Sequence, residues 1–481
     1  MDQTRELFDA RCHWIGGEWR RPRATETLEV RDPSTEEVFG AVACGSSQDI
    51  DDAVSAALSA LPAWGQSSMD ERLRLLERLC QVVEDQSDDF ASLITREVGA
   101  PVSISGAAHV GLAVEILRSF IEIGKQFPLE ERVGQSLLLH EPVGAVGCIT
   151  PWNLPLILIA QKLGAALVAG CTVVLKPSEL TPFNALWLAE SLEEAGYLPG
   201  VFNVVTGDGR KTGEALVKSA GISKISFTGS TRAGRRVSEL AAGTVKRVGL
   251  ELGGKSANVI LDELVLEQAV RTGIHQACFN SGQSCIAWSR ILVPRSCMPE
   301  AAEIARDALS NMQVGDPQDP STVIGPLVSE AAMSRVESYI RSGMSEGAEL
   351  VLGGPGRPEG LDRGYFVRPT VFSSVTAEMT VAREEIFGPV VCILAYDDED
   401  EAVAIANATD YGLHGSVWSN DEERAMAVAR QIRTGMVNIN GYGFDPLAPF
   451  GGCKQSGVGK ELGEEGLREF LETKTVQTFD I

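Results

Sequence analysis

One cysteine of this 481-residue chain stands in a setting suited to nucleophilic catalysis. Cys285 ends a run of small and polar residues, Asn-Ser-Gly-Gln-Ser-Cys, that begins at Asn280. Such a loop is less suited to a close-packed core than the apolar runs that hold most of the other nine cysteines. A thiol becomes a strong nucleophile when a neighbouring base or cation favours its thiolate. Cys285 is therefore the candidate nucleophile, and an inert loop cysteine is the alternative.

Two further side chains could assist this nucleophile. Glu251 stands between Leu250 and Leu252 and before a Gly-Gly pair, and apolar neighbours favour a raised carboxyl pKa and a role as general base. Asn153 lies in a loop between two prolines, where its amide could donate to an oxyanion. The alternatives are a solvated glutamate in a turn and a purely structural asparagine.

Two other motifs are suited to binding a nucleotide. Gly229 and Ser230 open the sequence Gly-Ser-Thr-Arg-Ala-Gly between an apolar run and a helical pattern, and a helix N-terminus binds phosphate. The GxxxxG spacing is neither GxGxxG nor a Walker A loop, so an ordinary strand-to-helix turn is the alternative. Lys176 and Glu179 follow another apolar run, where they could bind ribose hydroxyls or form a surface ion pair.

The residues from 143 to 260 alternate short β-rich runs with helical patterns, as βαβ units require. The runs are apolar on both faces, which predicts a parallel sheet covered by helices. We expect strands at 143–150, 171–176, 201–205 and 222–228, and helices at 156–168, 182–195, 211–219 and 232–242, with earlier helices at 48–65 and 69–98. The motifs above would then lie at the carboxyl edge of the sheet, where open α/β folds bind ligands.

A second α/β region is expected from about 254 to 453, with strands at 290–293, 390–394 and 436–439. Two segments, 132–141 and 471–479, belong to neither region. Each has the pattern of a strand, but no other predicted strand lies next to it in the sequence. A lone strand is not stable in water, so we expect the two to pair with each other, with another subunit, or with both.

The amino-acid composition argues against several kinds of partner and ligand. The 42 Lys and Arg against 66 Asp and Glu give a net charge of −24, which argues against a nucleic-acid partner. The ten cysteines form no CxxC pair and the five histidines no zinc spacing, so we expect no metal and reduced thiols. We see no apolar targeting segment and no apolar run near the ~20 residues of a membrane span, so we expect a cytoplasmic protein without a membrane partner.

Together and in this order, the motifs resemble those of the NAD(P)-dependent aldehyde dehydrogenase superfamily, over about residues 12–479. The 34 residues from Glu251 to Cys285 fit the family's spacing between Glu-Leu-Gly-Gly-Lys and Gly-Gln-x-Cys. Further family motifs are Glu-Glu-Ile-Phe-Gly-Pro-Val at 384–390 and Pro-Phe-Gly-Gly at 449–452, with Lys-Gln-Ser-Gly after it.

The resemblance implies a role for each matching residue. Cys285 would attack the aldehyde carbon, Asn153 and the Cys285 backbone N–H would bind the oxyanion, and Glu251 would activate the thiol and the hydrolytic water. Lys162 and Glu461 match a pair that the family uses for proton relay. The implied cofactor contacts are Ile149, Trp152, Lys176, Glu179, Gly209, Gly229, Ser230, Leu252, Glu385 and Phe387.

The positions that resemble the family's aldehyde funnel are mostly apolar. None is Arg or Lys, so nothing among them would hold a carboxylate or phosphate, and an uncharged aliphatic or aromatic aldehyde is implied. These positions are Leu154, Ile157, Gln161, Phe279, Ser284, Ile286, Phe444 and Phe450.

The resemblance also implies the architecture: a Rossmann-like NAD-binding domain, a second α/β catalytic domain and a small β oligomerisation element. We expect them at 1–123 with 142–253, at 254–453, and at 124–141 with 454–481. The chain would assemble as a homodimer or homotetramer. NAD is expected over NADP, the alternative, because a carboxylate at Glu179 would repel a 2′-phosphate.

The implied reaction is oxidation of an aldehyde to a carboxylic acid through a thiohemiacetal and a thioester on Cys285. One alternative is a CoA-acylating relative, and the presence of Glu251 speaks against it, because such members tend to lack that base. The other is a non-enzymatic binding protein on the same scaffold, which would be expected to have lost Cys285, Glu251 or Asn153.

Overall fold

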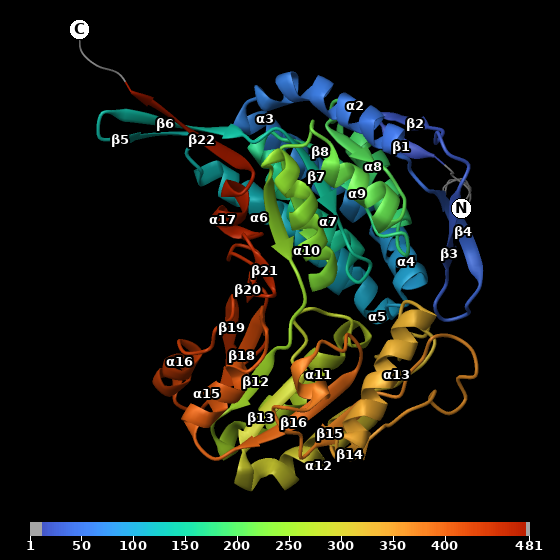
Figure 1. Ribbon diagram of the computed structural model, residues 1–481, viewed down its shortest axis with the longest axis vertical. Coiled ribbons are helices and arrows are strands. Elements are labelled where there is room, and N and C mark those ends of the chain that lie inside the picture. The colour runs from blue at the N-terminus through green and yellow to red at the C-terminus, as the bar shows by residue number, and fades with distance from the viewer. Residues whose placement is uncertain (1–11, 478–481) are drawn as a thin grey trace.

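The apolar runs between 145 and 251 form the centre of the first sheet (Figure 1). Its five parallel strands are β7 (Ala145–Ile149), β8 (Thr172–Lys176), β9 (Phe202–Val204), β10 (Lys224–Thr228) and β11 (Arg247–Glu251). They lie in the order β9-β8-β7-β10-β11, so the winding reverses between β7 and β10. All residues of β7, β8, β9 and β10 are buried, as a sheet covered on both faces requires. The structure describes residues 12–477.

Short antiparallel strands extend this sheet at both edges. β1 (His13–Ile15) and β2 (Glu18–Arg20) continue it beyond β9, and β21 (Gly457–Val458) pairs with β11. β3 (Thr27–Arg31) and β4 (Val38–Ala43) form a separate hairpin. The predicted strands and parallel sheet of this region are confirmed.

The part of the chain that contains this first sheet is called the first unit. Its helices lie between the strands as predicted, with two differences. They are α2 (Ser47–Gly65), α7 (Pro155–Ala169), α8 (Phe183–Ala195), α9 (Glu214–Lys218) and α10 (Thr231–Ala241). The single helix expected at 69–98 is two, α3 (Met69–Asp85) and α4 (Ser87–Val98), because Gln86 leaves helical geometry and bonds through its side chain to Trp187 and Ser191 of α8. The helix expected at 211–219 starts as a π-helical turn (Gly209–Gly213), where Asp208 accepts from the Lys211 N–H.

The second unit contains a seven-stranded sheet in the order β14-β15-β16-β13-β12-β18-β19. Its strands are β12 (Ala257–Ile260), β13 (Arg290–Pro294), β14 (Glu349–Leu352), β15 (Thr370–Ser373), β16 (Val390–Tyr396), β18 (His414–Trp418) and β19 (Met436–Ile439). All neighbours are parallel except β14 and β15, and the three predicted strands are confirmed. Its helices are α11 (Leu266–Cys278), α12 (Met298–Ser310), α13 (Glu330–Ser345), α14 (Thr380–Arg383), α15 (Glu399–Asn407) and α16 (Glu422–Ala429).

The two predicted strands that belonged to neither region form a three-stranded sheet. This sheet projects from the rest of the molecule, here called the body (Figure 1). β22 (Leu471–Gln477) pairs antiparallel with β6 (Ser136–Pro142), which confirms the predicted pairing for the described residues; 478 and 479 lie outside them. The stretch expected as one strand is a hairpin, because the chain turns at Gly134 (φ +60°) and returns from β5 (Glu130–Val133).

Most of the C-terminal element expected at 454–481 lies against the body instead. β20 (Cys453–Lys454) pairs with β17 (Tyr411–Gly412), β21 pairs with β11, and α17 (Gly463–Arg468) packs on α7. The close approach at Gly457 (φ +146°) explains this course, because a Cβ there would lie 2.0 Å from the Leu250 carbonyl oxygen. Of the described residues of that segment, 471–477 belong to the projecting sheet.

One helical run, 102–126, is long and apolar enough to cross a membrane by length and composition alone, contrary to the expectation that no run would be. It comprises α5 (Val102–Ile104), a π-helical turn (Ser105–Gly111) and α6 (Leu112–Gln126). More than half of its most apolar window is buried, and α6 packs on α7 and α3. A core helix meets the same criteria, and the other face of α6 carries Glu115 and Lys125.

Glu97 of α4 is a buried carboxyl that fixes the start of α8. It accepts from the Phe183 N–H at 2.7 Å and from Asn184 Nδ2 at 2.6 Å. Burial raises the pKa of Glu97 to about 8. The folded protein therefore holds a proton that an unfolded chain releases near pH 4.5.

This group makes the folded state lose stability as pH rises from about 4.5 to about 8, by at most about 1.4 kcal/mol per pH unit. Glu97→Gln cannot ionise, so its Tm relative to the native protein should rise between pH 6 and pH 9. Calorimetry at constant ionic strength measures this, with the exposed Glu193→Gln on α8 as control. A pH-independent Tm difference for Glu97→Gln would contradict the burial of a protonated carboxyl.

Candidate active site

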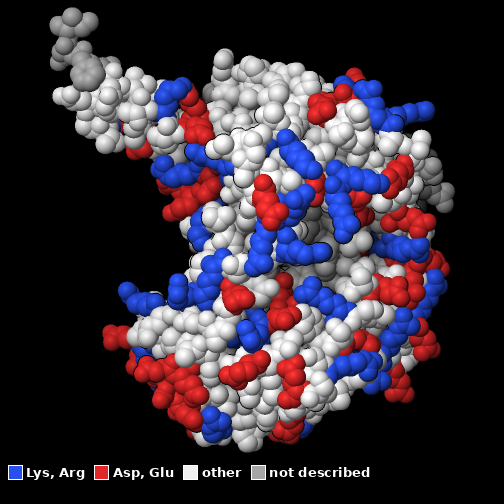
Figure 2. All heavy atoms as spheres, in the orientation of Figure 1, with Lys and Arg blue, Asp and Glu red and all other residues white. Residues whose placement is uncertain are grey.

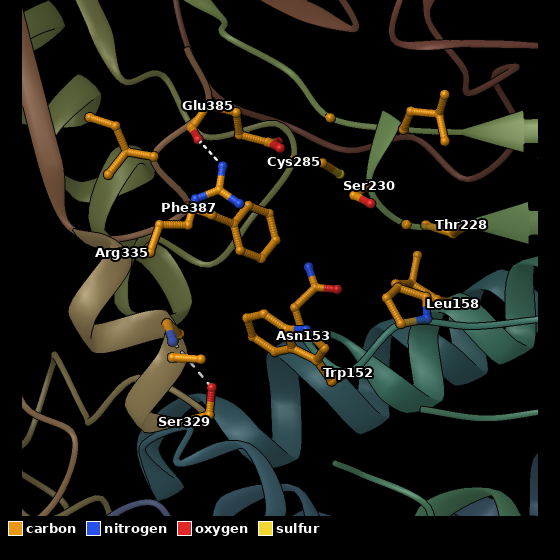
Figure 3. A pocket seen from close by; sticks show the side chains of 17 residues that line it. Trp152, Asn153, Leu158, Thr228, Ser230, Cys285, Ser329, Arg335, Glu385 and Phe387 are labelled. Atoms are coloured by element: carbon orange, nitrogen blue, oxygen red, sulfur yellow. Dashed lines mark hydrogen bonds between the residues drawn. The ribbon is translucent and has the colours of Figure 1, made fainter. Parts of the chain in front are cut away.

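A cavity of about 320 Å³ lies where the carboxyl ends of β7, β10 and β11 face the second unit (Figure 3). The first unit contributes Pro151, Trp152, Asn153, Leu158, Thr228, Gly229, Ser230, Leu252 and Gly253 to its lining. The second unit contributes Cys285, Ser329, Ala331, Ala332, Arg335, Glu385, Ile386 and Phe387. The cavity thus lies at the point where the strand order reverses, the usual ligand site of an open α/β sheet.

The start of α10 gives this cavity an anion-binding edge. Ser230 caps the helix by accepting from the Ala233 N–H at 3.3 Å, and N–H groups of the first turn have no partner within the helix. Close packing needs glycine here, because a Cβ at Gly229 would lie 2.6 Å from the Phe227 ring and one at Gly234 2.6 Å from Leu252. This edge fits a phosphate group.

Basic side chains surround the same edge. Figure 2 shows Lys and Arg gathered over α10 and around the hollow beside it, although the chain carries a net charge of −24. Arg232, Arg235 and Arg236 all belong to α10. Such a local excess of positive charge attracts an anionic ligand toward the cleft.

Four predicted cofactor residues do not line this cavity. Lys176 ends β8 next to Ile149 of β7, and its Nζ donates to the Gly207 carbonyl at 2.8 Å and to Glu179 at 3.3 Å. Burial lowers the pKa of Lys176, whereas the Glu179 side chain is 40% exposed. Gly209 begins the π-helical turn that follows Gly207. Lys176 and Glu179 therefore meet at the end of β8.

At the opposite end of the cavity, Glu385 closes against the glycine pair after β11. It accepts from the Gly254 N–H at 2.9 Å, and a Cβ at Gly253 would lie 2.4 Å from its Oε2. Burial raises the pKa of Glu385. Phe387, in the left-handed region (φ +63°), places its ring 5.4 Å from and perpendicular to that of Trp152. These two rings come from opposite units.

The loop that carries Cys285 is bent by three consecutive left-handed residues, Asn280 (φ 52°), Ser281 (φ 59°) and Gly282 (φ 73°). A Cβ at Gly282 would lie 2.3 Å from the carbonyl carbon of Gly388. Figure 3 shows the Cys285 thiol at the cavity wall. Burial, with the charges of nearby carboxylates, raises the pKa of Cys285 to about 12, so the free protein holds a neutral thiol.

Asn153 points into the cavity from the loop after β7 (Figure 3). Its side chain is buried, and its Nδ2 donates to the Gln283 carbonyl at 2.9 Å. An amide nitrogen carries two hydrogens, so this bond fixes the side chain and leaves one N–H for a ligand. The geometry therefore allows an oxyanion to be bound near the thiol.

Glu251 ends β11 and is buried behind the cavity, which it does not line. A Cβ at Gly451 would lie 2.4 Å from its Oε1, and its Oε2 has no hydrogen-bond partner among the described residues. Burial, together with the charge of Glu461, raises the pKa of Glu251 well above its usual value. This is the direction expected for a carboxyl between apolar neighbours.

Lys162 of α7 and Glu461 form a buried ion pair close to Glu251. The Lys162 Nζ donates to Glu461 and, at 2.7 Å, to the Thr228 hydroxyl, which lines the cavity. Ser226 also donates to Glu461, at 3.2 Å. Polar groups therefore connect the cavity wall to the buried pair.

The predicted substrate positions do not line the cavity just described. Cys285 packs on the first hydrophobic core, to which Ile157, Ile286 and Phe450 belong and against which Leu154 and Phe444 also pack. The two rings of Phe444 and Phe450 lie 5.9 Å apart. The remaining positions are the buried Gln161 and Ser284, and Phe279, whose ring stacks on His109.

Sequence reasoning missed several residues of the cavity. Thr228 was predicted only as the last residue of a strand, and Arg335 was not singled out. Arg335 lines the cavity and donates to the Glu385 carbonyl at 2.6 Å (Figure 3). Ser329 caps α13, and a serine before a helical pattern is a signal that could have placed it. Within residues 12–477, no group of three or more His, Cys, Asp and Glu side chains could hold a metal ion.

Comparison with known proteins agrees with this geometry. The sequence pattern of the aldehyde dehydrogenase family matches residues 19–476. The chain is 48% identical to 3-succinoylsemialdehyde-pyridine dehydrogenase of a Pseudomonas species, over 98% of this chain and 100% of that protein.

Two solved structures share the fold throughout. A cysteine-to-alanine variant of aldehyde dehydrogenase C of Pseudomonas syringae, complexed with NAD⁺ and octanal, is similar with a TM-score of 0.96, 45% identity and coverage of 97% and 96% of the two chains. The aldehyde dehydrogenase of Mycobacterium tuberculosis, complexed with NAD⁺, gives a TM-score of 0.95, 43% identity and coverage of 97% and 98%.

The raised pKa of Cys285 predicts slow alkylation of the free protein at neutral pH. Because the thiolate fraction grows about tenfold per pH unit below the pKa, the rate with iodoacetamide should rise by about that factor per unit from pH 7 to pH 10. Peptide-resolved mass spectrometry measures it, with Cys285→Ala to verify the labelled peptide. A plateau at or below pH 8 would contradict a thiol held neutral by its surroundings.

Proposed function

This chain belongs to the aldehyde dehydrogenase family, and from that premise we propose that it oxidises an uncharged aliphatic or aromatic aldehyde to the carboxylic acid with NAD. The observation that carries the proposal is the cavity that brings together the Cys285 thiol, the Asn153 amide and the anion-binding start of α10. A nucleophile, an oxyanion donor and a phosphate site are the parts that such a reaction needs.

We assign the first steps to the cavity residues. The Cys285 sulfur attacks the aldehyde carbon as its proton leaves, which turns the carbonyl oxygen into an oxyanion. The free N–H of Asn153 and the Cys285 backbone N–H stabilise that oxygen, and loss of one such donor typically lowers turnover about a hundred- to a thousand-fold. Bound NAD supplies the nicotinamide ring that accepts the hydride from the substrate carbon.

We assign the proton transfers to the buried acid groups. Glu251 takes a proton from the thiol and later from the water that hydrolyses the thioester, and a raised pKa suits a carboxyl that exchanges protons near neutral pH. The Lys162–Glu461 pair, with the Thr228 hydroxyl, provides a polar route from the cavity to this region.

The residues present fit the dinucleotide. Its pyrophosphate would lie at Gly229 and Ser230, its adenosine ribose at Lys176 and Glu179, and its nicotinamide end near Glu385, Phe387, Trp152 and Leu252, with Ile149 and Gly209 bordering the adenosine end. The free N–H groups of α10 and the glycine contacts around it support this assignment. The exposed carboxylate of Glu179 supports NAD over NADP, as do the NAD⁺ complexes of the two similar structures.

The substrate class rests on the predicted substrate positions, most of which are apolar and belong to or pack against the hydrophobic core that Cys285 also contacts. We propose Leu154, Ile157, Phe279, Ser284, Ile286, Phe444 and Phe450 as the residues that contact the aldehyde. None of these side chains is a cation that could pair with an anionic group. One similar protein is named for a pyridine semialdehyde, and another was solved with octanal.

We also propose the domain roles and the cellular setting. Residues 142–253 with 1–123 would bind NAD and 254–453 would carry the nucleophile, which the two sheets support. The ten free thiols support a reducing, cytoplasmic location.

An absorbance screen for NADH with purified protein tests the function. Uncharged aliphatic and aromatic aldehydes should give turnover with NAD, and a semialdehyde carboxylate should give a lower kcat/KM. Cys285→Ala should abolish turnover and retain NAD binding. A tenfold preference for the carboxylate would refute the substrate class, and appreciable turnover in Cys285→Ala would remove it as the nucleophile.

The same screen with CoA separates hydrolysis from acyl transfer. CoA should leave the rate and the acid product unchanged, whereas formation of an acyl-CoA would support the alternative reaction. Glu251→Gln should slow release of the acid, and wild-type rates at every pH in this variant would assign the base elsewhere.

The projecting sheet supports a proposed homodimer or homotetramer. Its outer strands β5 and β22 expose their edges in one chain, and Val133 of β5 is 56% exposed. Exposed edges pair readily with a second chain.

Removal of 472–481 should therefore yield a monomer that keeps the body fold, as measured by light scattering and calorimetry. The matched control removes only 478–481 and leaves β22 intact, so it should assemble like the full chain. A stable oligomer after the longer deletion would exclude β22 from the interface.

A further inference from the structure

Asn280 links the nucleophile loop to the loop that holds Asn153. Its Nδ2 donates to the Asn153 carbonyl at 2.8 Å and lies 3.5 Å from the Gln283 carbonyl. Asn153 in turn donates through its own Nδ2 to the Gln283 carbonyl at 2.9 Å, and the Gln283 N–H donates to the Asn280 carbonyl at 3.1 Å. The three residues thus form a closed ring of hydrogen bonds.

This ring spans the two units. Asn153 follows β7 of the first sheet, whereas Asn280 and Gln283 precede Cys285 in the second unit. Among the described residues, the Asn153–Gln283 and Asn280–Asn153 bonds are the hydrogen bonds that join 150–154 to 279–285. The separation between the amide of Asn153 and the thiol of Cys285 therefore depends on both.

Because these residues are buried, loss of the hydrogen bond from Asn280 to the Asn153 carbonyl would be costly. Asn280 is 1% exposed and Asn153 3%, so a lost donor would leave the Asn153 carbonyl without a partner and out of reach of bulk water. The Oδ1 of Asn280 has no partner among the described residues, so the side chain acts in this ring only as a donor.

We propose that Asn280 is a positioning residue for the oxyanion hole: it holds the Asn153 loop at the distance from Cys285 that the reaction needs. The inference rests on the proposed function, because it assumes that Asn153 binds the oxyanion. A misplacement of about 1 Å in such a site lowers turnover by about a hundred-fold.

A purely conformational role is the competing explanation. Asn280 adopts φ 52°, and asparagine tolerates the left-handed region better than most residues. Ser281 has nearly the same backbone (φ 59°), but its hydroxyl donates to the Gly325 carbonyl at 3.0 Å, away from Asn153. Ser281→Gly therefore removes a side chain from the same bend without touching the ring, and it serves as the matched control.

Two variants remove the donor in different ways. Asn280→Gly keeps access to the left-handed backbone, whereas Asn280→Asp keeps the shape and places an acceptor against two carbonyl oxygens. We expect each to lower kcat about ten- to a hundred-fold with KM for NAD unchanged, and Asn280→Gly to leave the alkylation rate of Cys285 unchanged. Ser281→Gly should change kcat less than threefold.

A double-mutant cycle with Asn153→Ala separates positioning from general damage to the fold. If Asn280 acts through Asn153, Asn280→Gly should lower kcat little further in the Asn153→Ala background. Full multiplication of the two effects, or wild-type kcat in both Asn280 variants, would overturn the proposal. Wild-type activity of Asn153→Ala alone would instead overturn the oxyanion assignment on which the inference rests.

Discussion

The site depends on one close approach, at the Gly253–Gly254 pair where the chain leaves the first sheet for the second unit. A Cβ at Gly253 would lie 2.4 Å from Glu385, and one at Gly254 would lie 2.3 Å from the Cys285 carbonyl oxygen. The Gly254 N–H also donates to Glu385. Cys285 and Glu385 of the second unit are therefore held against Gly253 and Gly254, which follow β11 and Leu252. Any side chain here would push the thiol and the carboxylate away from the sheet edge at which ligands bind.

The same packing sets the protonation of the site. Because the units close on each other, Glu251 is buried and Cys285 and Glu385 are partly buried, and burial raises the pKa of each. A neutral thiol and a carboxyl of raised pKa would protect the free enzyme from unwanted alkylation. In the proposed mechanism, ionisation of the thiol would follow ligand binding, which brings a positive charge or a proton acceptor to it.

Much of this arrangement could be predicted from the sequence, because its signals are local. Short apolar runs predicted four central strands of the first sheet and three of the seven strands of the second, and the carboxyl edge of the first sheet was expected to hold Asn153, Ser230 and Glu251. Arg335 could not be predicted, because a helical arginine carries no mark of the carbonyl that it will meet 50 residues later in the chain. The break at Gln86 and the course of 454–470 were also missed, since each depends on a tertiary contact, with α8 and with β11.

Charge distribution explains how an acidic protein can take an anionic cofactor. A net charge of −24 would repel a dinucleotide if it were spread evenly over the surface. Lys and Arg instead gather around the hollow (Figure 2). The helix α10 carries three arginines, and N–H groups of its first turn have no partner within the helix. Because surface potentials fall off within about 10 Å at ordinary ionic strength, the local sign at the cleft outweighs the distant acidic surface. The acidic remainder of the surface then serves solubility while the cleft stays attractive to phosphate.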